Sequence, residues 1–337
     1  MDLGTLIRLP LGLAPALTFL GALMYLDSYK LVRPRVVLTI IVTGALVAGA
    51  SYLISLSFYS VAELPLAAYS RYVAPLVEES LKAAVLIWMI QRQRIGFIID
   101  AAIFGFTVGT GFAVIENLYY LWVFPDAHVG VWIVRGFGTA IMHGGCTSIF
   151  AMISLSLLER QGNNDPKAYM IGILIATLIH SVFNHFFLSP LVSTLAIMVI
   201  LPPLMLVVFQ QSERSVEEWL DVGFDSDTEL LELINSGGLS DSPVGQYLHS
   251  LKARFQGPIM ADLICYLRLH VELAMRAKGV VMMRENGFPV EVDPLTRASF
   301  DELKYLEESI GPTGKLALKP FLQMSRKDLA QLYMLEA

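Results

Sequence analysis

Charged, amide and imidazole side chains interrupt four long apolar stretches of this 337-residue sequence. An ionised side chain at the centre of a bilayer costs roughly 2.5–3.5 kcal/mol on insertion scales, so several such groups should face one another, water or a metal. The four stretches hold, in order, Glu78, Glu79 and Lys82; Glu116; Arg135 and His143; and His180 and Asn184.

This set of residue types suits the activation of water. A glutamate can take a proton from water, and histidine or asparagine can donate hydrogen bonds to the oxyanion of a tetrahedral intermediate. Two histidines and one carboxylate can also hold a catalytic Zn²⁺ with an open position for water. The sequence has no HExxH and no GxSxG motif, which argues against a common zincin and a serine hydrolase. A zinc enzyme and a metal-free glutamate enzyme both remain open.

The polar groups are predicted to lie at one depth in the membrane. At a helical rise of about 1.5 Å per residue, they lie roughly 20–25 Å from the inner interface of a hydrocarbon core about 30 Å thick. Four helices would therefore bring acid and imidazole groups to one level in the outer half of the bilayer. The separations from cytoplasmic charges are 13 residues for Glu79 to Arg92, 16 for Glu116 to Asp100, 17 for His143 to Arg160 and 13 for His180 to Lys167.

Local spacing refines this prediction. Lys82 follows Glu78 by four residues and Glu79 by three, so it can neutralise one carboxylate while the other stays free. Pro75 should kink the helix one turn earlier and free a backbone carbonyl. Gly105 and Gly109 form a GxxxG pattern, which lets a helix approach its neighbour closely.

The elements that must position these groups are membrane-spanning helices. Apolar residues make up 55% of the chain and charged residues 16%, against typical values of about 45–50% and about 25%. A spanning helix needs about 20 mostly apolar residues. We therefore predict an all-α, polytopic membrane helix bundle of about seven spans with a C-terminal helical cytoplasmic domain. The spans are 9–27, 36–59, 72–91, 97–124, 129–158, 168–188 and 190–210.

Charge divides the chain into a membrane part and an acidic tail. Residues 1–210 carry 11 basic and 10 acidic residues, whereas 211–337 carry 13 and 20. We expect a transmembrane catalytic domain over 1–210, an acidic linker over 211–227 and a helical domain over 228–337. The helical domain should include a long helix from about Pro258 to Glu285 and a last helix from Ser325 to the end. No basic stripe is present that would bind nucleic acid.

The distribution of Lys and Arg in the short loops predicts the orientation. It places the chain as a multi-pass protein of the plasma (inner) membrane, with the N-terminus outside and the C-terminal domain in the cytoplasm. That domain has no second catalytic motif, so we expect it to bind a regulator or to self-associate.

Four motifs resemble those of PrsW-type intramembrane proteases. These proteases share a superfamily with the CAAX prenyl endopeptidases and bacteriocin-processing membrane proteins. The resemblance covers roughly residues 60–190, and each motif lies on its own span. The matches are Glu78-Glu79-Ser80-Leu81-Lys82 with EExxK, Phe112 to Asn117 with FxxxEN, Arg135 with His143 as the third motif, and His180 to Asn184 with HxxxN.

The resemblance implies hydrolysis of a peptide bond in a membrane-anchored protein such as an anti-sigma factor, from the extracytoplasmic side. It implies that Glu78 activates water and that Glu79 and Lys82 tune it. The prenyl endopeptidases carry a histidine where this chain has Glu116. The resemblance therefore suggests Glu116, His143 and His180 as ligands of Zn²⁺, although a metal-free mechanism stays possible. The remaining candidate catalytic residues are Asn117, Arg135 and Asn184, of which Asn184 would help to bind the oxyanion or a metal.

Two other classes of function use the same features less well. A proton- or cation-coupled transporter could use the buried carboxylates as a relay, but transporters are often built from repeated halves, and no internal repeat is apparent here. A non-catalytic scaffold that signals through the acidic tail gives no reason for Glu78, His143 and His180 to share a level. An intramembrane protease is therefore the preferred function.

Overall fold

The computed structural model describes residues 3–27, 32–62, 64–161, 165–252, 254–288, 294–318 and 322. Throughout these residues the secondary structure is helical, with no β-strand, which confirms the predicted all-α class. The chain divides into two compact units. We call Met1–Ser212 the membrane unit and Glu213–Ala337 the C-terminal unit, and describe each by itself.

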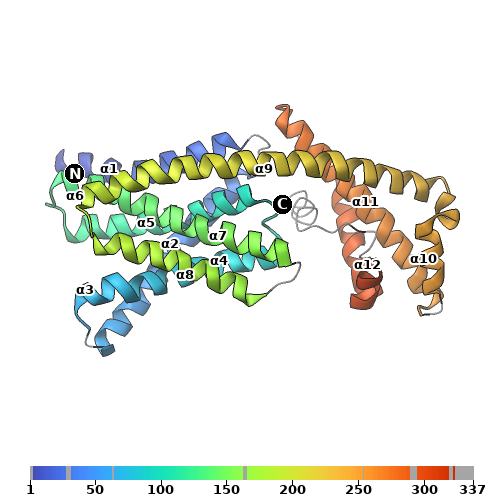
Figure 1. Cartoon of the computed structure of the whole chain (residues 1–337), viewed down its shortest axis with the longest axis horizontal. Coiled ribbons are helices and arrows are strands. Elements are labelled where there is room, and N and C mark those ends of the chain that lie inside the picture. The colour runs from blue at the N-terminus through green and yellow to red at the C-terminus, as the bar shows by residue number, and fades with distance from the viewer. Residues whose placement is uncertain are drawn as a thin grey trace. The chain divides into compact units, whose positions relative to one another are not determined.

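The membrane unit consists of long apolar helices that run side by side (Figure 1). Six helical segments of the described chain are long and apolar enough to cross a membrane: Gly4–Leu26, Pro34–Phe58, Ile98–Val123, Val129–Arg160, Pro166–His185 and Pro190–Ser212. The expected third span corresponds to α4, whose three charged residues set it apart from these six. The long helices of the unit are α1 (Leu3–Leu26), α2 (Pro34–Ala62), α4 (Ala74–Gln91), α5 (Ile98–Val123), α7 (Ile141–Gln161), α8 (Pro166–His185) and the first part of α9 (Pro190–Asn235).

Helix α5 forms the centre of the membrane unit. It packs against α1, α2 and α7, and its residues from Ile99 to Ala113 are buried. Its glycines permit this approach, because a Cβ atom on Gly109 would lie 2.4 Å from the carbonyl oxygen of His143, and one on Gly105 would lie 2.6 Å from the Cα of Ser148. The GxxxG prediction is therefore confirmed, and it fixes the position of the helix that carries His143.

Two π-helical segments lie directly before two of the helices that carry candidate site residues. The segment η1 (Tyr69–Val73) follows α3 (Leu66–Ala68) and leads into α4, while η2 (Val134–Ala140) follows α6 (Val129–Ile133) and leads into α7. A π-helix bonds each carbonyl to the N–H five residues on and is frequent at functional sites. The distortion expected at Pro75 takes this form, since η1 ends two residues before it.

The C-terminal unit begins with a helix where a linker was expected. Residues 211–227 lie inside α9, which continues into the domain expected from residue 228 and ends at Asn235. The predicted long helix agrees with α11, whose side chains Leu263, Leu267 and Val271 form the core of the unit. The expected helix from Ser325 lies outside the described residues. The remaining elements are η3 (Gly238–Asp241), α10 (Pro243–Leu251), α11 (Gly257–Glu285) and α12 (Pro294–Leu318).

Candidate active site

One half of the site is organised by Glu79. Lys82 Nζ donates to Glu79 Oε1 at 2.6 Å, and His180 Nδ1 lies 2.8 Å from the same oxygen. All three side chains are buried. An ionised carboxylate only accepts hydrogen bonds, so we assign the proton of His180 to Nδ1, which leaves Nε2 with a lone pair when the ring is neutral. Lys82 therefore neutralises Glu79, one of the two pairings that the spacing allowed.

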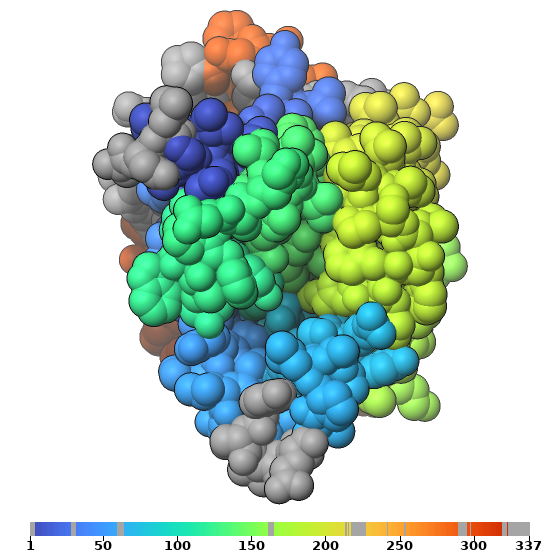
Figure 2. Space-filling model, turned by 90° about the vertical axis from the view of Figure 1, so that its left-hand side faces the viewer, coloured from blue at the N-terminus to red at the C-terminus, as the bar shows by residue number. Residues whose placement is uncertain are grey.

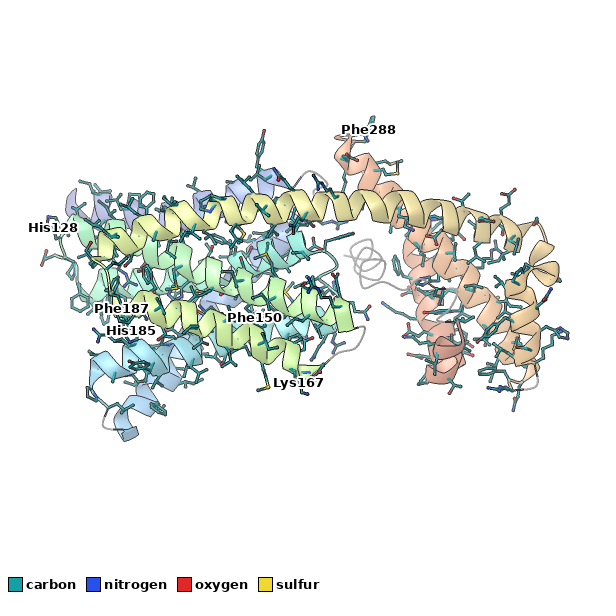
Figure 3. The ribbon with its side chains drawn as sticks, viewed as in Figure 1. His128, Phe150, Lys167, His185, Phe187 and Phe288 are labelled. Carbon is teal, nitrogen blue, oxygen red and sulfur yellow. The ribbon has the colours of Figure 1, made fainter. Side chains whose placement is uncertain are left out.

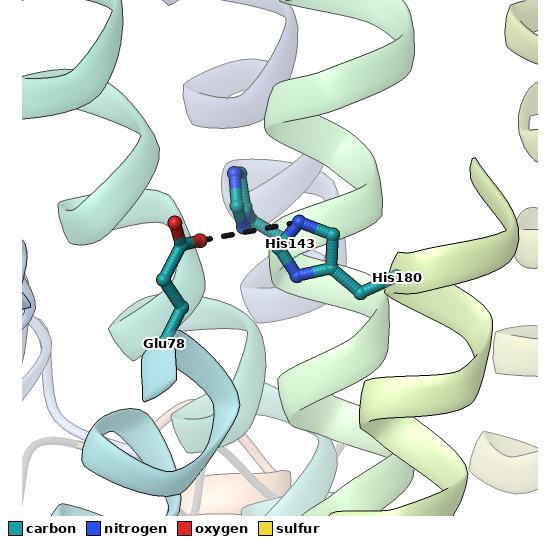
Figure 4. A group of neighbouring side chains, drawn as sticks. All are labelled: Glu78, His143 and His180. Atoms are coloured by element: carbon teal, nitrogen blue, oxygen red, sulfur yellow. Dashed lines mark ion pairs between the residues drawn. The ribbon is translucent and has the colours of Figure 1, made fainter. Parts of the chain in front are cut away.

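Glu78 faces the other side of the same imidazole. Its Oε2 atom lies 3.9 Å from His180 Nε2, and Figure 4 shows the two side chains pointing toward each other from α4 and α8. This oxygen is buried and has no hydrogen-bond partner within the described chain. A carboxylate oxygen and an imidazole lone pair are both acceptors, so they need a donor or a cation between them. Ligand atoms of Glu78, His143 and His180 lie within 4.8 Å of one another.

His143 joins the two halves of the cluster. Its Nδ1 lies 3.1 Å from Lys82 Nζ, and its Nε2 lies 3.1 Å from Glu116 Oε2. A lysine ammonium only donates, so we assign the proton of His143 to Nε2, which donates to Glu116. Phe112 supports this geometry, since its ring centroid lies 5.0 Å from that of His143 and 4.8 Å from Lys82 Nζ. In the sequence Phe112 stands out only as a motif position, and nothing there indicates this contact.

Arg135 and Asn117 hold Glu116 from outside the cluster. Arg135 Nη2 lies 3.0 Å from Glu116 Oε2, and Arg135 Nε donates to Asn117 Oδ1 at 2.8 Å. Asn117 in turn donates through Nδ2 to the carbonyl of Gly12 in α1 at 2.7 Å. The guanidinium carbon lies 3.6 Å from the ring centroid of Tyr120. These residues orient Glu116 rather than contact the two histidines.

A family model described as PrsW family intramembrane metalloprotease matches residues 33–208, just over half of the chain. The chain belongs to the PrsW family. It is therefore a multi-pass membrane peptidase that acts on a substrate within the bilayer. The transporter alternative finds no support in this assignment. The searches of curated proteins and of solved structures give no match.

One residue expected at the centre of this PrsW family site lies apart from it. Asn184 follows His180 by one helical turn, but its Nδ2 donates to the backbone carbonyl of Ser70 at 3.0 Å. Ser181, which sequence reasoning did not single out, bonds through Oγ to the carbonyl of Arg71 at 2.5 Å. Both contacts are with η1, the segment that leads into α4.

The site opens on one side. The exposed fractions of the side chains are 24% for Glu116, 15% for Glu78 and 12% for Arg135, against 3% or less for Glu79, Lys82, His143 and His180. These three partly exposed residues form what we call the mouth.

Next to the mouth lies a cavity of about 500 Å³ between the α6–η2 segment and the turn from α8 to α9. The space-filling view shows a hollow between these green and yellow-green segments (Figure 2). A cavity of this size and mostly apolar lining is typical of ligand pockets. Its lining includes His128, Val131, Arg135, Thr139, Phe186 and Leu191. Arg135 therefore belongs to both the mouth and the cavity.

Proposed function

We propose that this PrsW family protein cleaves a membrane-anchored protein with a water molecule activated by Glu78. The observation that carries the proposal is the pair of acceptors, Glu78 Oε2 and His180 Nε2, that face each other across 3.9 Å. A water there would donate one proton to each acceptor. As its oxygen attacks the peptide carbonyl, the proton passes to Glu78 and then to the amine that leaves.

The neighbouring groups would keep this arrangement in one protonation state. Glu79 holds the Nδ1 proton of His180, so that Nε2 stays an acceptor. Lys82 supplies the positive charge that lets Glu79 stay ionised although it is buried. The Nε2–H of His143 points toward Glu116 at the mouth. In the substrate complex this N–H would turn from Glu116 to the oxyanion that forms on the substrate carbonyl.

The same residues would hold a Zn²⁺ through Glu78, His143 and His180, once a ring nitrogen of His143 gave up its present partner, Lys82 or Glu116. Glu78 Oε2 lacks a partner, and the bond from Glu79 to His180 Nδ1 is of the kind that orients metal-ligating histidines. We favour Glu78 over Glu116 as the carboxylate ligand, because Glu116 is already paired with Arg135. When bound, Zn²⁺ would lower the pKa of water and polarise the peptide carbonyl.

The site geometry also supports a route for the substrate. We propose that an apolar segment of a membrane-anchored protein, of the anti-sigma-factor type, enters through the cavity and reaches the mouth at Arg135. His128, His185 and Phe187 lie at one end of the membrane unit and Lys167 at the other, as Figure 3 shows. With Lys167 on the inner side, the mouth would lie toward the outside of the plasma (inner) membrane.

We propose further that the N-terminus lies outside and that the C-terminal unit lies in the cytoplasm. The basic residues of the short loops support this orientation. The unit has its own apolar core, built from α10, α11 and α12. We propose that it binds a regulator or self-associates there.

The decisive variants are Glu78→Gln and His180→Ala. Each should lower the cleavage of a single-span reporter protein, reconstituted with the enzyme in lipid vesicles, by roughly 10²–10⁴-fold. Chromatography and thermal unfolding should show that both variants remain folded. Glu159→Gln is the matched control, because it changes an exposed carboxylate near the end of α7. Full activity in both site variants would rule out this function.

Metal analysis separates the two mechanisms. If one metal ion per chain is present and is lost in His143→Ala, the protein is a metal-dependent enzyme. If a chelator removes all metal and cleavage continues at the same rate, Glu78 acts without metal.

A further inference from the structure

The segment that leads into Glu78 is bonded to α8 by two side chains. Ser181 Oγ donates to the carbonyl of Arg71 at 2.5 Å, and Asn184 Nδ2 donates to the carbonyl of Ser70 at 3.0 Å. Both carbonyls belong to the π-helical segment η1. Both donors therefore bond the backbone before α4 rather than the side chains of Glu79, Lys82 and His143.

Pro75 explains why these two carbonyls need outside donors. The N–H of Ala74 bonds to the carbonyl of Tyr69, five residues earlier, as a π-helix requires. The next N–H would come from residue 75, but proline has none. In a π-helix the carbonyl of Ser70 would bond the N–H five residues on, at position 75. In an α-helix the carbonyl of Arg71 would bond the N–H four residues on, which is also at position 75. These are the two carbonyls that α8 binds.

This connection lies within about two helical turns of the reacting groups on both helices, since Arg71 precedes Glu78 by seven residues. Ser181 directly follows His180 in α8, and Glu78 follows Pro75 by three residues in α4. The two bonds connect the segment before α4 to α8, so they hold α4 in one rotation about its axis. That rotation points Glu78 at His180 Nε2 and Glu79 at His180 Nδ1.

We propose that Ser181 and Asn184 are positioning residues, which set the rotation of α4 by bonding the two carbonyls that Pro75 leaves without a partner. The inference rests on the proposed role of Glu78. It also changes the role expected for Asn184, from a donor to the oxyanion to a support for the helix that carries Glu78.

The first test compares Ser181→Val with Ser181→Thr, which have nearly the same shape but differ in the hydroxyl. Displacement of a reacting group by about 1 Å can cost on the order of 10²-fold in rate. We expect Ser181→Val to lower kcat for the single-span reporter by roughly 10- to 100-fold without a change in KM, and Ser181→Thr to keep kcat within about threefold. Thr43→Val is the control, because it removes a hydroxyl that bonds to the carbonyl of Thr39 in its own helix at 2.9 Å. Equal activity of the Val and Thr variants would overturn the proposal.

The second test restores the missing donor with Pro75→Ala. The new N–H can satisfy one carbonyl, so it should recover most of the kcat lost in Asn184→Ala or in Ser181→Val, but not in the double variant. If Asn184 instead bound the oxyanion, Pro75→Ala would leave the loss in Asn184→Ala unchanged, and the proposal would be wrong. Should Pro75→Ala be inactive by itself, the Ser181 comparison decides.

These outcomes are separable from those of the proposed function. Full activity of Glu78→Gln would reject Glu78 as the base whatever the Ser181 variants do. Loss of activity in Glu78→Gln together with full activity in Ser181→Val would keep the proposed function and reject only the positioning role.

Discussion

Two buried lysines, one in each unit, form the same local contact with different consequences. Lys82 Nζ lies 2.6 Å from Glu79 Oε1, and Lys278 Nζ lies 2.6 Å from Asp227 Oδ2. Both lysines are at most 2% exposed. The carboxylates differ, because Glu79 is buried and also bonds His180, whereas the Asp227 side chain is 21% exposed. The Lys82–Glu79 pair is therefore shielded from solvent and joined to the imidazole of His180, whereas the Lys278–Asp227 pair reaches the surface of its unit.

The largest difference between the two lysines should appear in Lys82→Met. This change leaves Glu79 buried without its cation and frees Nδ1 of His143, so both histidines lose their assigned protonation. We expect reporter cleavage to fall by on the order of 10²-fold or more, by analogy with the loss of a general acid or base. Circular dichroism and chromatography would check that the variant is folded. Activity within twofold of the unaltered enzyme would contradict the proposed role of Glu79 and Lys82.

Lys278→Met should instead affect the stability of the C-terminal unit. Removing one partner of a fully buried pair typically costs 3–5 kcal/mol, and partial exposure of Asp227 should reduce this to about 1–3 kcal/mol. Cleavage by the folded enzyme should stay within about twofold, as measured on the same reporter below the unfolding transition. Hydrogen exchange along α11 would report the stability. Suppose that Lys278→Met stopped cleavage while the amides of α11 stayed protected from hydrogen exchange. Lys278 would then be needed for catalysis, as Lys82 is, and the contrast between the two lysines would be wrong.

The smallest effect on cleavage is expected for the cysteine of the C-terminal unit, which serves to test the side of the membrane on which that unit lies. Cys265 is exposed in the C-terminal unit and Cys146 is buried in the membrane unit, and both are free. A membrane-impermeant maleimide should label Cys265 only after the cells are permeabilised and should leave Cys146 unlabelled. The cleavage rate should not change in Cys265→Ser, which serves as the unlabelled control. Labelling of Cys265 in intact cells would place the C-terminal unit outside.

Much of the fold followed from composition and spacing. The apolar stretches predicted long membrane helices, and the GxxxG pattern predicted that α5 approaches a neighbouring helix closely, which proves to be the helix that carries His143. The interruption of four such stretches predicted the residues that meet in the cluster. These predictions succeed because an unpaired polar group is costly in the bilayer. A charged residue in a spanning helix therefore indicates that a partner, water or a metal lies beside it.

The pairing within the cluster could not be read from spacing. Lys82 can reach either glutamate along a helix, and the choice of Glu79 depends on His180, which is 101 residues away in the chain. The partner of Asn184 could not be read from spacing either. Its spacing from His180 predicted a shared face, whereas its partner is a carbonyl freed by the π-helical register before Pro75. Pro75 predicted that a backbone carbonyl would be freed, but the sequence does not indicate which side chains bind it.

The most direct test of the central claim is an experimental density map of the membrane unit at a resolution that shows ordered water and ions. We predict density for a water or an ion in contact with Glu78 Oε2 and His180 Nε2, with the His143 side chain turned toward the same point. Glu78, His143 and His180 separated from one another, or directed into the lipid, would contradict the account.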